Sequence, residues 1–584
     1  MKNISRFSRI LSICMLAVAT LSSCHDDEGI APISTNGEDD YKYVGEAVKG
    51  FDKSEWFPGG ELGTTQNTGA TCYTDEAPAV NVAGLYNAFK SGEFFFERNF
   101  VEKSSTKDLM GLGPAYVRQS CVACHPNYGH GARKSRYNAD DMGNGYLLVI
   151  YHPTDGDNGD DGPYISEVTG MPQTRATSPF LPPVEESGIS IEWKTLSGMM
   201  PSGLSATQFP DGERYELIYP EVNIAQSAFN TSPLPTNYTV RLESTIGLYG
   251  TGLLDAIPED SIKKEYQRQA ASAMARGDNV SDMLNPAFWD SSRNDWAGDP
   301  SLGKANGAWY LLADGTMKVK RFTYAMTRAS LQDGAGANAI WNIPNVSRSD
   351  RHFLYTTTAW ATAMSENPSV ISAIKADPSS PYYNDGTDEG IAAAVKTLLD
   401  PKTDQFDNAY HNFSPEMTDN NFWQYMVWHR GLAVPRARDL NDATVQRGKE
   451  VFRQIGCAEC HRAQWHTGKD DYWAPAPITS KGLSLPVFPN QTIYPYTDMI
   501  QHRLYMKNGI HGSWCRTTPL WGRGLSAINT GAEDRLHDCR ARNEIEAIMW
   551  HAYGENSDAL WSVKMFYNLP KSDRDAVVKF LRSI

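Results

Sequence analysis

The sequence is poor in positive charge and in long apolar segments, and each shortage excludes a class of protein. Its 54 Lys and Arg residues against 69 Asp and Glu give a net charge of −15, which argues against a nucleic-acid partner. After one short apolar run near the N-terminus, no second long apolar segment follows, so we expect membrane contact through lipid only. Apolar residues make up 41% and charged residues 21% of the chain, as in soluble globular proteins.

Cysteine is also scarce, with nine in 584 residues, yet four of the nine form two short motifs, Cys121-Val-Ala-Cys124-His125 and Cys457-Ala-Glu-Cys460-His461. Cys-x-x-Cys-His is the attachment signature of c-type haem. A zinc ribbon would need a second cysteine pair at short spacing, and a redox dithiol a neighbouring βαβ pattern; neither is evident. We therefore expect two covalent haem c groups, with His125 and His461 as iron ligands.

The N-terminus predicts export. Lys2 and Arg6 precede an apolar run over 10–21, and small residues lead to Cys24. This is the pattern of a signal peptide, and the cysteine after the cut resembles a bacterial lipobox; an ordinary signal peptide is the alternative. We expect residues 1–23 to be a lipoprotein signal peptide, Cys24 to be lipidated and 24–59 to be a tether. The expected location is the cell envelope, facing the periplasm or on the outer-membrane surface, where c-type haem is found.

Three cysteines remain for the mature protein: Cys72, Cys515 and Cys539. An odd number in an oxidising compartment leaves at least one without a partner. Cys515 and Cys539 are close in sequence, so we expect a disulfide between them, worth about 3 kcal/mol by loop closure, and an unpaired Cys72.

The pattern around the motifs occurs twice. Residues 441–455 predict a helix, with Asn441 as N-cap, that runs into the second motif. A glycine and an aromatic residue in that helix recur before the first motif, as Gly92 with Phe95 and Gly448 with Phe452. Residues 248–253 and 520–525 also resemble each other, with glycines at matched offsets that indicate close backbone packing. The start of a final helix is predicted at 572–575, which resembles a capping box.

Together these segments resemble the di-haem oxidoreductase family, formerly labelled thiol oxidoreductases, which is related to the bacterial di-haem cytochrome c peroxidases. The matching segments are 111–125, 252–259, 448–461, 496–502, 516–522, 536–541 and 547–551. The resemblance implies a mainly α fold, with two cytochrome c-like haem domains and a large irregular insertion between them. We place the domains at 60–300 and 431–584 and the connecting region at 301–430.

The resemblance also implies roles for single residues. His551 falls where related peroxidases carry a methionine ligand, so we expect it to be the second ligand of the C-terminal haem. His130 is a weaker candidate ligand for the N-terminal haem, because it lies only five residues from His125. Glu259 is the candidate acid–base group, whereas His502 and His537 are better explained as structural.

The function implied is that of a peroxidase-like oxidoreductase. Electrons from a small cytochrome or a quinol-linked donor would enter at the C-terminal haem, and peroxide or another small substrate would be reduced at the N-terminal haem. The alternatives are a non-catalytic electron-transfer cytochrome and a haem lipoprotein that serves iron acquisition. The acidic run at 155–162 offers oxygen ligands for Ca²⁺, although it lacks the downstream Glu of an EF-hand and an exposed turn is the simpler interpretation.

Overall fold

The computed structural model describes residues 51–106, 109–153, 163–312, 314–331, 336–471, 481–510 and 514–584. The predicted signal peptide, the lipidation site at Cys24 and the candidate Ca²⁺ run at 155–162 lie outside the described residues. Among the helices of the described ranges, none combines the length and the apolar character that crossing a membrane requires.

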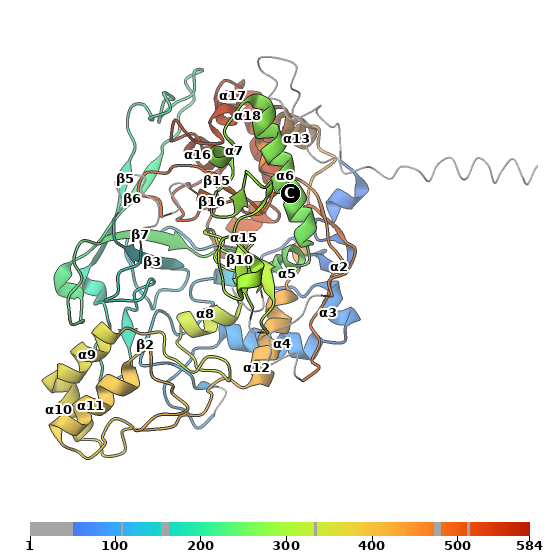
Figure 1. Ribbon diagram of the computed structural model, residues 1–584. Coiled ribbons are helices and arrows are strands. Elements are labelled where there is room, and N and C mark those ends of the chain that lie inside the picture. Colours follow the sequence, from blue (N-terminus) through green and yellow to red (C-terminus); the bar gives the residue numbers. More distant parts are fainter. Residues whose placement is uncertain are drawn as a thin grey trace, which may run out of the picture.

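Two pairs of crossing helices organise the chain around the haem motifs (Figure 1). Helix α4 (Tyr86–Glu97) precedes the first motif and packs on α12 (Asp419–Arg430). Helix α13 (Ala443–Gln454) precedes the second motif and packs on α18 (Lys571–Leu581). Because α12 lies in the range expected to be connecting, the first helix pair joins segments that are distant in sequence. The expected domain boundaries themselves stay a prediction.

Each crossing depends on a glycine of its own. A Cβ atom at Gly92 would collide with the carbonyl group of Gln424, and one at Gly448 would collide with that of Ala576. Only glycine lets two helix backbones approach so closely. The two helix pairs therefore share one packing geometry, as the repeated sequence pattern predicts.

The aromatic residue of the repeat is Phe96 rather than Phe95. The Phe96 ring lies 6.0 Å from the ring of His125, and the Phe452 ring lies 6.3 Å from the ring of His461. Phenylalanine four residues after the glycine lies on the same helix face, whereas Phe95, at three residues, contacts Arg98 instead. The matched pairs are thus Gly92 with Phe96 and Gly448 with Phe452.

The expectation of a mainly α fold is wrong. Helices hold only 32% of the chain and strands hold 14%. Much of the strand content follows the first motif, between residues 146 and 244. There β3 (Tyr146–Tyr151) pairs antiparallel with β7 (Thr239–Ser244), and β5 (Ile189–Thr195) pairs antiparallel with β6 (Ile218–Ile224). Ile and Val residues recur at every second position in parts of β5 and β6, a pattern that suits half-buried strands. The family resemblance implied a mainly α fold and did not predict these strands.

The two glycine-containing repeats at 248–253 and 520–525 lie against each other. Gly250 and Gly522 both have left-handed backbones, with φ of 75° and 69°. A Cβ atom at Gly250 would lie 2.5 Å from the Trp521 ring, and one at Gly522 would lie 2.9 Å from the Tyr249 ring. The repeats therefore form a reciprocal contact between the segment that follows the first haem motif and the segment that follows the second. The predicted close packing of these glycines is confirmed.

Two predicted helix starts differ in detail. The N-cap of α13 is Asp442, whose side chain accepts hydrogen bonds from the N–H groups of Thr444 and Val445, and not Asn441. Helix α18 starts at Lys571 after Pro570 and has no side-chain cap, so the capping box expected at 572–575 is not formed. Proline at the N-cap fixes the backbone there without a side-chain acceptor.

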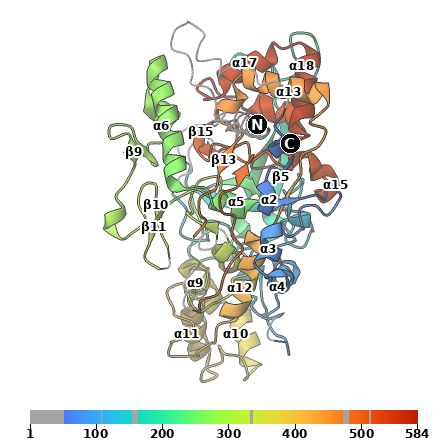
Figure 2. The same cartoon turned by 90° about the vertical axis from the view of Figure 1, so that its right-hand side faces the viewer.

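A separate helical layer forms one end of the molecule. Helices α9 (Thr358–Glu366), α10 (Pro368–Lys375) and α11 (Asp388–Leu399) pack around a small core of their own that contains Trp360 and Ile391. Figures 1 and 2 both place this layer at the opposite end from α13, α17 and α18. Helix α6 (Glu259–Arg276) lies on the flank, beside the small β8–β11 hairpins (Figure 2).

The remaining elements are short. The helices are α2 (Gly60–Gly63), α3 (Pro78–Val82), α5 (Thr251–Asp255), α7 (Val280–Met283), α8 (Ala337–Asn342), α15 (Ser526–Thr530), α16 (Glu544–Trp550) and α17 (Leu560–Tyr567). The strand pairs are β1 (Thr64–Thr65) with β12 (Val434–Pro435), β2 (Ala115–Tyr116) with β4 (Arg175–Ala176), β8 (Trp289–Asp290) with β9 (Asp295–Trp296), β10 (Trp309–Leu311) with β11 (Met317–Val319), β13 (Trp465–His466) with β14 (Thr492–Ile493), and β15 (Gln501–Arg503) with β16 (Trp514–Arg516).

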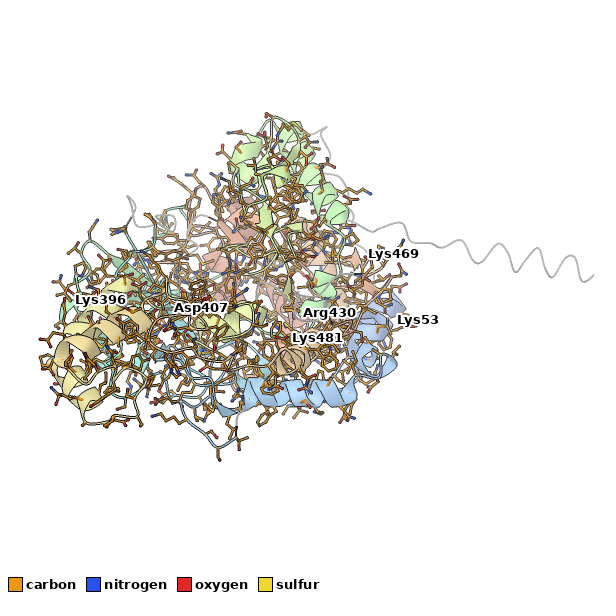
Figure 3. All side chains as sticks on the ribbon, turned by 60° about the horizontal axis from the view of Figure 1, so that its bottom comes forward. Lys53, Lys396, Asp407, Arg430, Lys469 and Lys481 are labelled. Carbon is orange, nitrogen blue, oxygen red and sulfur yellow. The ribbon has the colours of Figure 1, made fainter. Side chains whose placement is uncertain are left out.

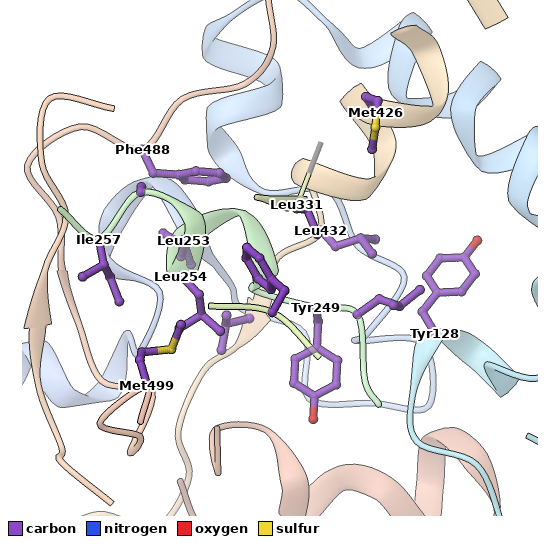
Figure 4. Packing of buried hydrophobic residues seen from close by; sticks show 14 of the residues in the cluster. Tyr128, Tyr249, Leu253, Leu254, Ile257, Leu331, Met426, Leu432, Phe488 and Met499 are labelled. Carbon is purple, nitrogen blue, oxygen red and sulfur yellow. The ribbon is translucent and has the colours of Figure 1, made fainter. Parts of the chain in front are cut away.

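The largest core joins the first haem region to its neighbours. It contains Cys121 of the first motif and residues of α4, α5 and α12. Figure 4 shows part of it, with Tyr249 between Tyr128 and Leu254. A second core surrounds Cys457 and is built from α13, α16, α17 and α18. Each haem motif thus borders its own apolar core.

Candidate haem sites

The second motif opens into a large, mostly apolar cavity. Its empty space is about 1680 Å³, part of it open to solvent. The lining includes all three motif side chains and three further histidines: Cys457, Cys460, His461, His502, His537 and His551. The two thiols that would attach a porphyrin therefore border this cavity.

The histidines of the two motifs are held in the same way. The Nδ1–H group of His461 donates to the carbonyl oxygen of Tyr496 at 3.0 Å, and that of His125 donates to Ile246 at 2.9 Å. This tautomer leaves Nε2 for a metal. Burial lowers the pKa of each histidine to about 4, so both imidazoles are neutral, the form that binds iron.

His551 lines the same cavity as His461. It follows the last residue of α16, and its Nδ1–H group donates to the carbonyl oxygen of Ala547 at 2.7 Å. Burial lowers the pKa of His551. The resemblance singled out this residue, and the structure gives it the tautomer and charge state of an axial ligand.

Four arginines line the same cavity: Arg276, Arg516, Arg523 and Arg535. Arg516 is almost fully buried, and its Nε–H group donates to the carbonyl oxygen of Thr323 at 3.1 Å. Haem carries two propionates, and buried guanidinium groups are suited to bind carboxylates. The sequence analysis treated Arg516 only as part of a motif. Nothing in the sequence next to Arg516 indicated that its side chain would reach this cavity.

Cys460, Asp498 and His502 bring their ligand atoms within 4.8 Å of one another. His502 Nε2 lies 2.6 Å from Asp498 Oδ2. A metal ion in this cluster would compete with the haem for the Cys460 sulfur, and the two remaining groups are too few to hold an ion. We interpret His502 and Asp498 as a buried pair that supports the second haem attachment.

Backbone groups engage two weaker candidates, His130 and Glu259. Both ring nitrogens of His130 contact carbonyl oxygens, those of Gly131 at 2.9 Å and Leu536 at 3.1 Å, which leaves neither for a metal. Glu259 accepts a hydrogen bond from the N–H group of Val319 at 3.0 Å, in the first turn of α6. It borders a separate pocket that contains none of the motif residues.

The expected disulfide is not formed. Cys539 Sγ lies 3.1 Å from Ser244 Oγ and is directed toward β7, whereas Cys515 lies in β16 with its Sγ near the Arg516 carbonyl. No disulfide joins these two cysteines. The short sequence separation was misleading, because the turn at Cys539, with φ of 63°, directs its side chain away from β16. Cys72 is fully buried, and burial raises its pKa to about 11.

The sequence analysis missed one histidine. His429 lies on α12 and is only 4% exposed. Burial lowers its pKa to about 3, with a further contribution from nearby His125. In the sequence it has no motif of its own; only its place one residue from the end of the helix that pairs with α4 could have drawn attention to it.

These observations fit haem at both motifs. Neutral histidines with a defined tautomer, buried or half-buried thiols in Cys-x-x-Cys pairs and arginines at the second cavity match what a covalently attached porphyrin needs. At the first site, the imidazole of His429 is buried and has no hydrogen-bond partner in the described ranges, which suits a neighbouring prosthetic group.

Comparison with known proteins supports this interpretation for the C-terminal part. Residues 401–584 match the protein family described as "Di-haem oxidoreductase, putative peroxidase". No curated protein matches the sequence significantly. Among solved structures, a variant of the diheme peroxidase BthA from Burkholderia thailandensis is 12% identical, covers 69% of this chain and 95% of that chain, and has a TM-score of 0.19, a value too low to carry an argument. Over residues 401–584, the chain is thus similar to the di-haem oxidoreductase family.

Proposed function

We propose that this protein is an exported c-type cytochrome with two covalent haems that reduces peroxide. Its family supplies the class, which is a di-haem, peroxidase-like oxidoreductase with a peroxide substrate and a redox partner. We infer that electrons enter at the C-terminal haem and that peroxide is reduced at the N-terminal haem. When bound, the haems supply the electron-transfer and peroxide-reducing chemistry; the chain holds them, sets their ligands and excludes water.

The pairing of His461 with His551 is the observation that carries this division. Both line one cavity, and both donate Nδ1–H to a backbone carbonyl group. Two such ligands would close the second iron, and a six-coordinate haem mainly transfers electrons. At the first motif His125 is held in the same way, but His130 is engaged by two carbonyl groups. This contrast supports an N-terminal haem that binds substrate.

Rapid mixing of the half-reduced protein with peroxide tests the proposal. One peroxide takes up two electrons and two protons and yields two waters, so we expect the protein to lose two electrons for each peroxide consumed. The visible spectrum should show which haem reacts first. A protein that retains its electrons in the presence of peroxide is not a peroxidase.

Export and lipid anchoring form a separate part of the proposal. The charged start, the apolar run and Cys24 support a lipoprotein signal, and c-type haem attachment in an exported protein agrees with it. We expect Cys24→Ala to release the protein from the membrane fraction or to leave the leader uncleaved. Unchanged membrane association and processing would exclude the lipid anchor and leave the haem proposal standing.

One observation favours a second function, that of a non-catalytic electron-transfer cytochrome. His429 is a buried, neutral imidazole near His125. If it ligates the first iron, both haems are closed to small molecules. The spin state of the first haem separates the two functions.

A further inference from the structure

His429 is a buried polar side chain that the described structure leaves without a hydrogen-bond partner. Neither Nδ1 nor Nε2 has one among the residues described, although the side chain is only 4% exposed. A buried polar group left unsatisfied is costly, because it loses its hydrogen bonds to water. A side chain with this cost calls for a partner that the described residues do not supply.

The helix pairs show which way His429 faces. Gly92 meets Gln424 on α12, and Gly448 meets Ala576 on α18. Five residues after these contact points lie His429 and Leu581, respectively. Leu581 lines the cavity of the second haem. Because the two crossings match, His429 takes the equivalent place at the first haem, with an imidazole where the second site has an apolar side chain.

His429 lies close to His125, but the two side chains contact different segments. The Phe96 ring lies 6.0 Å from His125 and 4.2 Å from Trp428, the residue before His429. His125 is held by the carbonyl group of Ile246, ahead of α5. The Nδ1 atom of His429 instead faces Gly336, where α8 begins, and a Cβ there would lie 2.9 Å from it.

Figure 4 shows two residues that, like His429, lie next to Gly336. Met426, one turn before His429 on α12, and Leu331 belong to the same core as Leu432. The Met426 side chain and the Leu331 carbonyl group are, with His429, the atoms nearest a Cβ built at Gly336. His429 is thus the polar group of an otherwise apolar wall.

We propose that His429 is the acid–base group of the first haem site. Resting on the proposed function, we infer that its neutral imidazole takes the proton from one oxygen of peroxide and returns it to the other oxygen. The O–O bond breaks, two electrons arrive from the redox partner, and two protons from solvent complete two waters. A positioned base of this kind contributes roughly 10²–10⁴-fold to the rate. Glu259, which accepts a hydrogen bond from the N–H group of Val319, then has a structural role.

Two variants test the role of His429. His429→Leu copies Leu581 of the second site, and His429→Gln keeps a polar side chain of similar size that cannot take a proton. We expect both to keep two haems and wild-type spin states, and to react with peroxide about 10²–10⁴-fold more slowly. His466→Leu, the same change at an exposed histidine on β13 outside both haem sites, should leave the peroxide rate unchanged.

Cyanide binding gives a readout that is independent of turnover. Hydrogen cyanide must lose its proton to bind iron, so loss of the base should slow cyanide binding to the oxidised first haem as well. If the wild type ignores peroxide but cyanide binding depends on His429, the proposed function fails and the base assignment stands.

Three results would overturn the assignment. An unchanged cyanide rate in both variants shows that His429 moves no proton. A change of the first haem from low-spin to high-spin shows that it is an iron ligand instead. Loss of the first haem in both variants shows a role in haem retention, because attachment needs only the motif residues.

Discussion

The backbone of Gly250 lies against the ring of Trp521: a Cβ atom added at Gly250 would lie 2.5 Å from Cζ2 of that ring. Tyr249 and Gly522 repeat the contact in the opposite sense. This reciprocal contact fixes how the first and second haem regions meet. The distance between two redox centres sets how fast electrons pass, so the contact bears on function as well as on stability.

Gly250→Ala should destabilise the protein by about 1–3 kcal/mol, because the new methyl group overpacks the contact with Trp521. Gly250 also has φ of 75°, which alanine adopts only with strain. Gly277→Ala is the control for that strain, since Gly277 has φ of 81° and a Cβ atom added there would meet no neighbouring atom within 4 Å. Chemical denaturation of both variants measures the difference. Equal losses would show that the contact with Trp521 adds nothing.

His551→Ala should change the second haem and leave the first as it is. Removal of the imidazole opens the sixth position, so a low-spin haem becomes high-spin or takes up water. Haem content should not change, because attachment depends on Cys457 and Cys460. Visible and magnetic circular dichroism spectra measure the effect. His466→Ala, at an exposed histidine on β13, is the control, and a wild-type spectrum for His551→Ala would disprove the ligand assignment.

Local patterns predicted the attachment motifs, the helix before the second motif and the glycine contact between the repeats. These features depend on residues close in sequence or on repeats that match by eye. His551 came from the family resemblance, and the structure gives it a suitable tautomer beside His461.

The rest depends on contacts between distant segments. Pairing of β3 with β7 spans residues 146–244, and α12 reaches α4 across most of the chain. His429 inherits its place from that long-range contact. The predicted disulfide was wrong for the same reason, since the sequence separation of two cysteines does not show where the Cys539 side chain is directed.

Replacing both Cys121 and Cys124 by alanine should remove one haem and leave the other. Each motif attaches its own porphyrin, so the variant should retain one covalent haem per chain after acid–acetone extraction, and the wild type two. The pyridine haemochrome assay counts them. Replacement of Cys72, a buried cysteine outside both motifs, is the control and should leave both haems. A wild-type count of one or none contradicts the two-haem account.

Arg430→Met should destabilise the fold by about 3–5 kcal/mol, because it leaves buried carboxylates without their partner. Arg430, labelled in Figure 3, pairs with Asp255 at 2.9 Å and with Asp470, and all three side chains are at most 1% exposed. Lys375→Ala breaks the exposed pair with Asp388 and should cost less than about 1 kcal/mol. Thermal unfolding compares them. Equal stability of the two variants would show that the buried network is not stabilising.

The central claim is that the second haem is closed by two histidines and the first is open to substrate. Electron paramagnetic resonance of the oxidised protein, before and after cyanide, tests it most directly. We predict one low-spin signal of a bis-histidine haem that cyanide leaves unchanged, and one high-spin signal that cyanide converts to low-spin. Two low-spin haems, neither of which binds cyanide in any redox state, would contradict the account and leave an electron-transfer cytochrome.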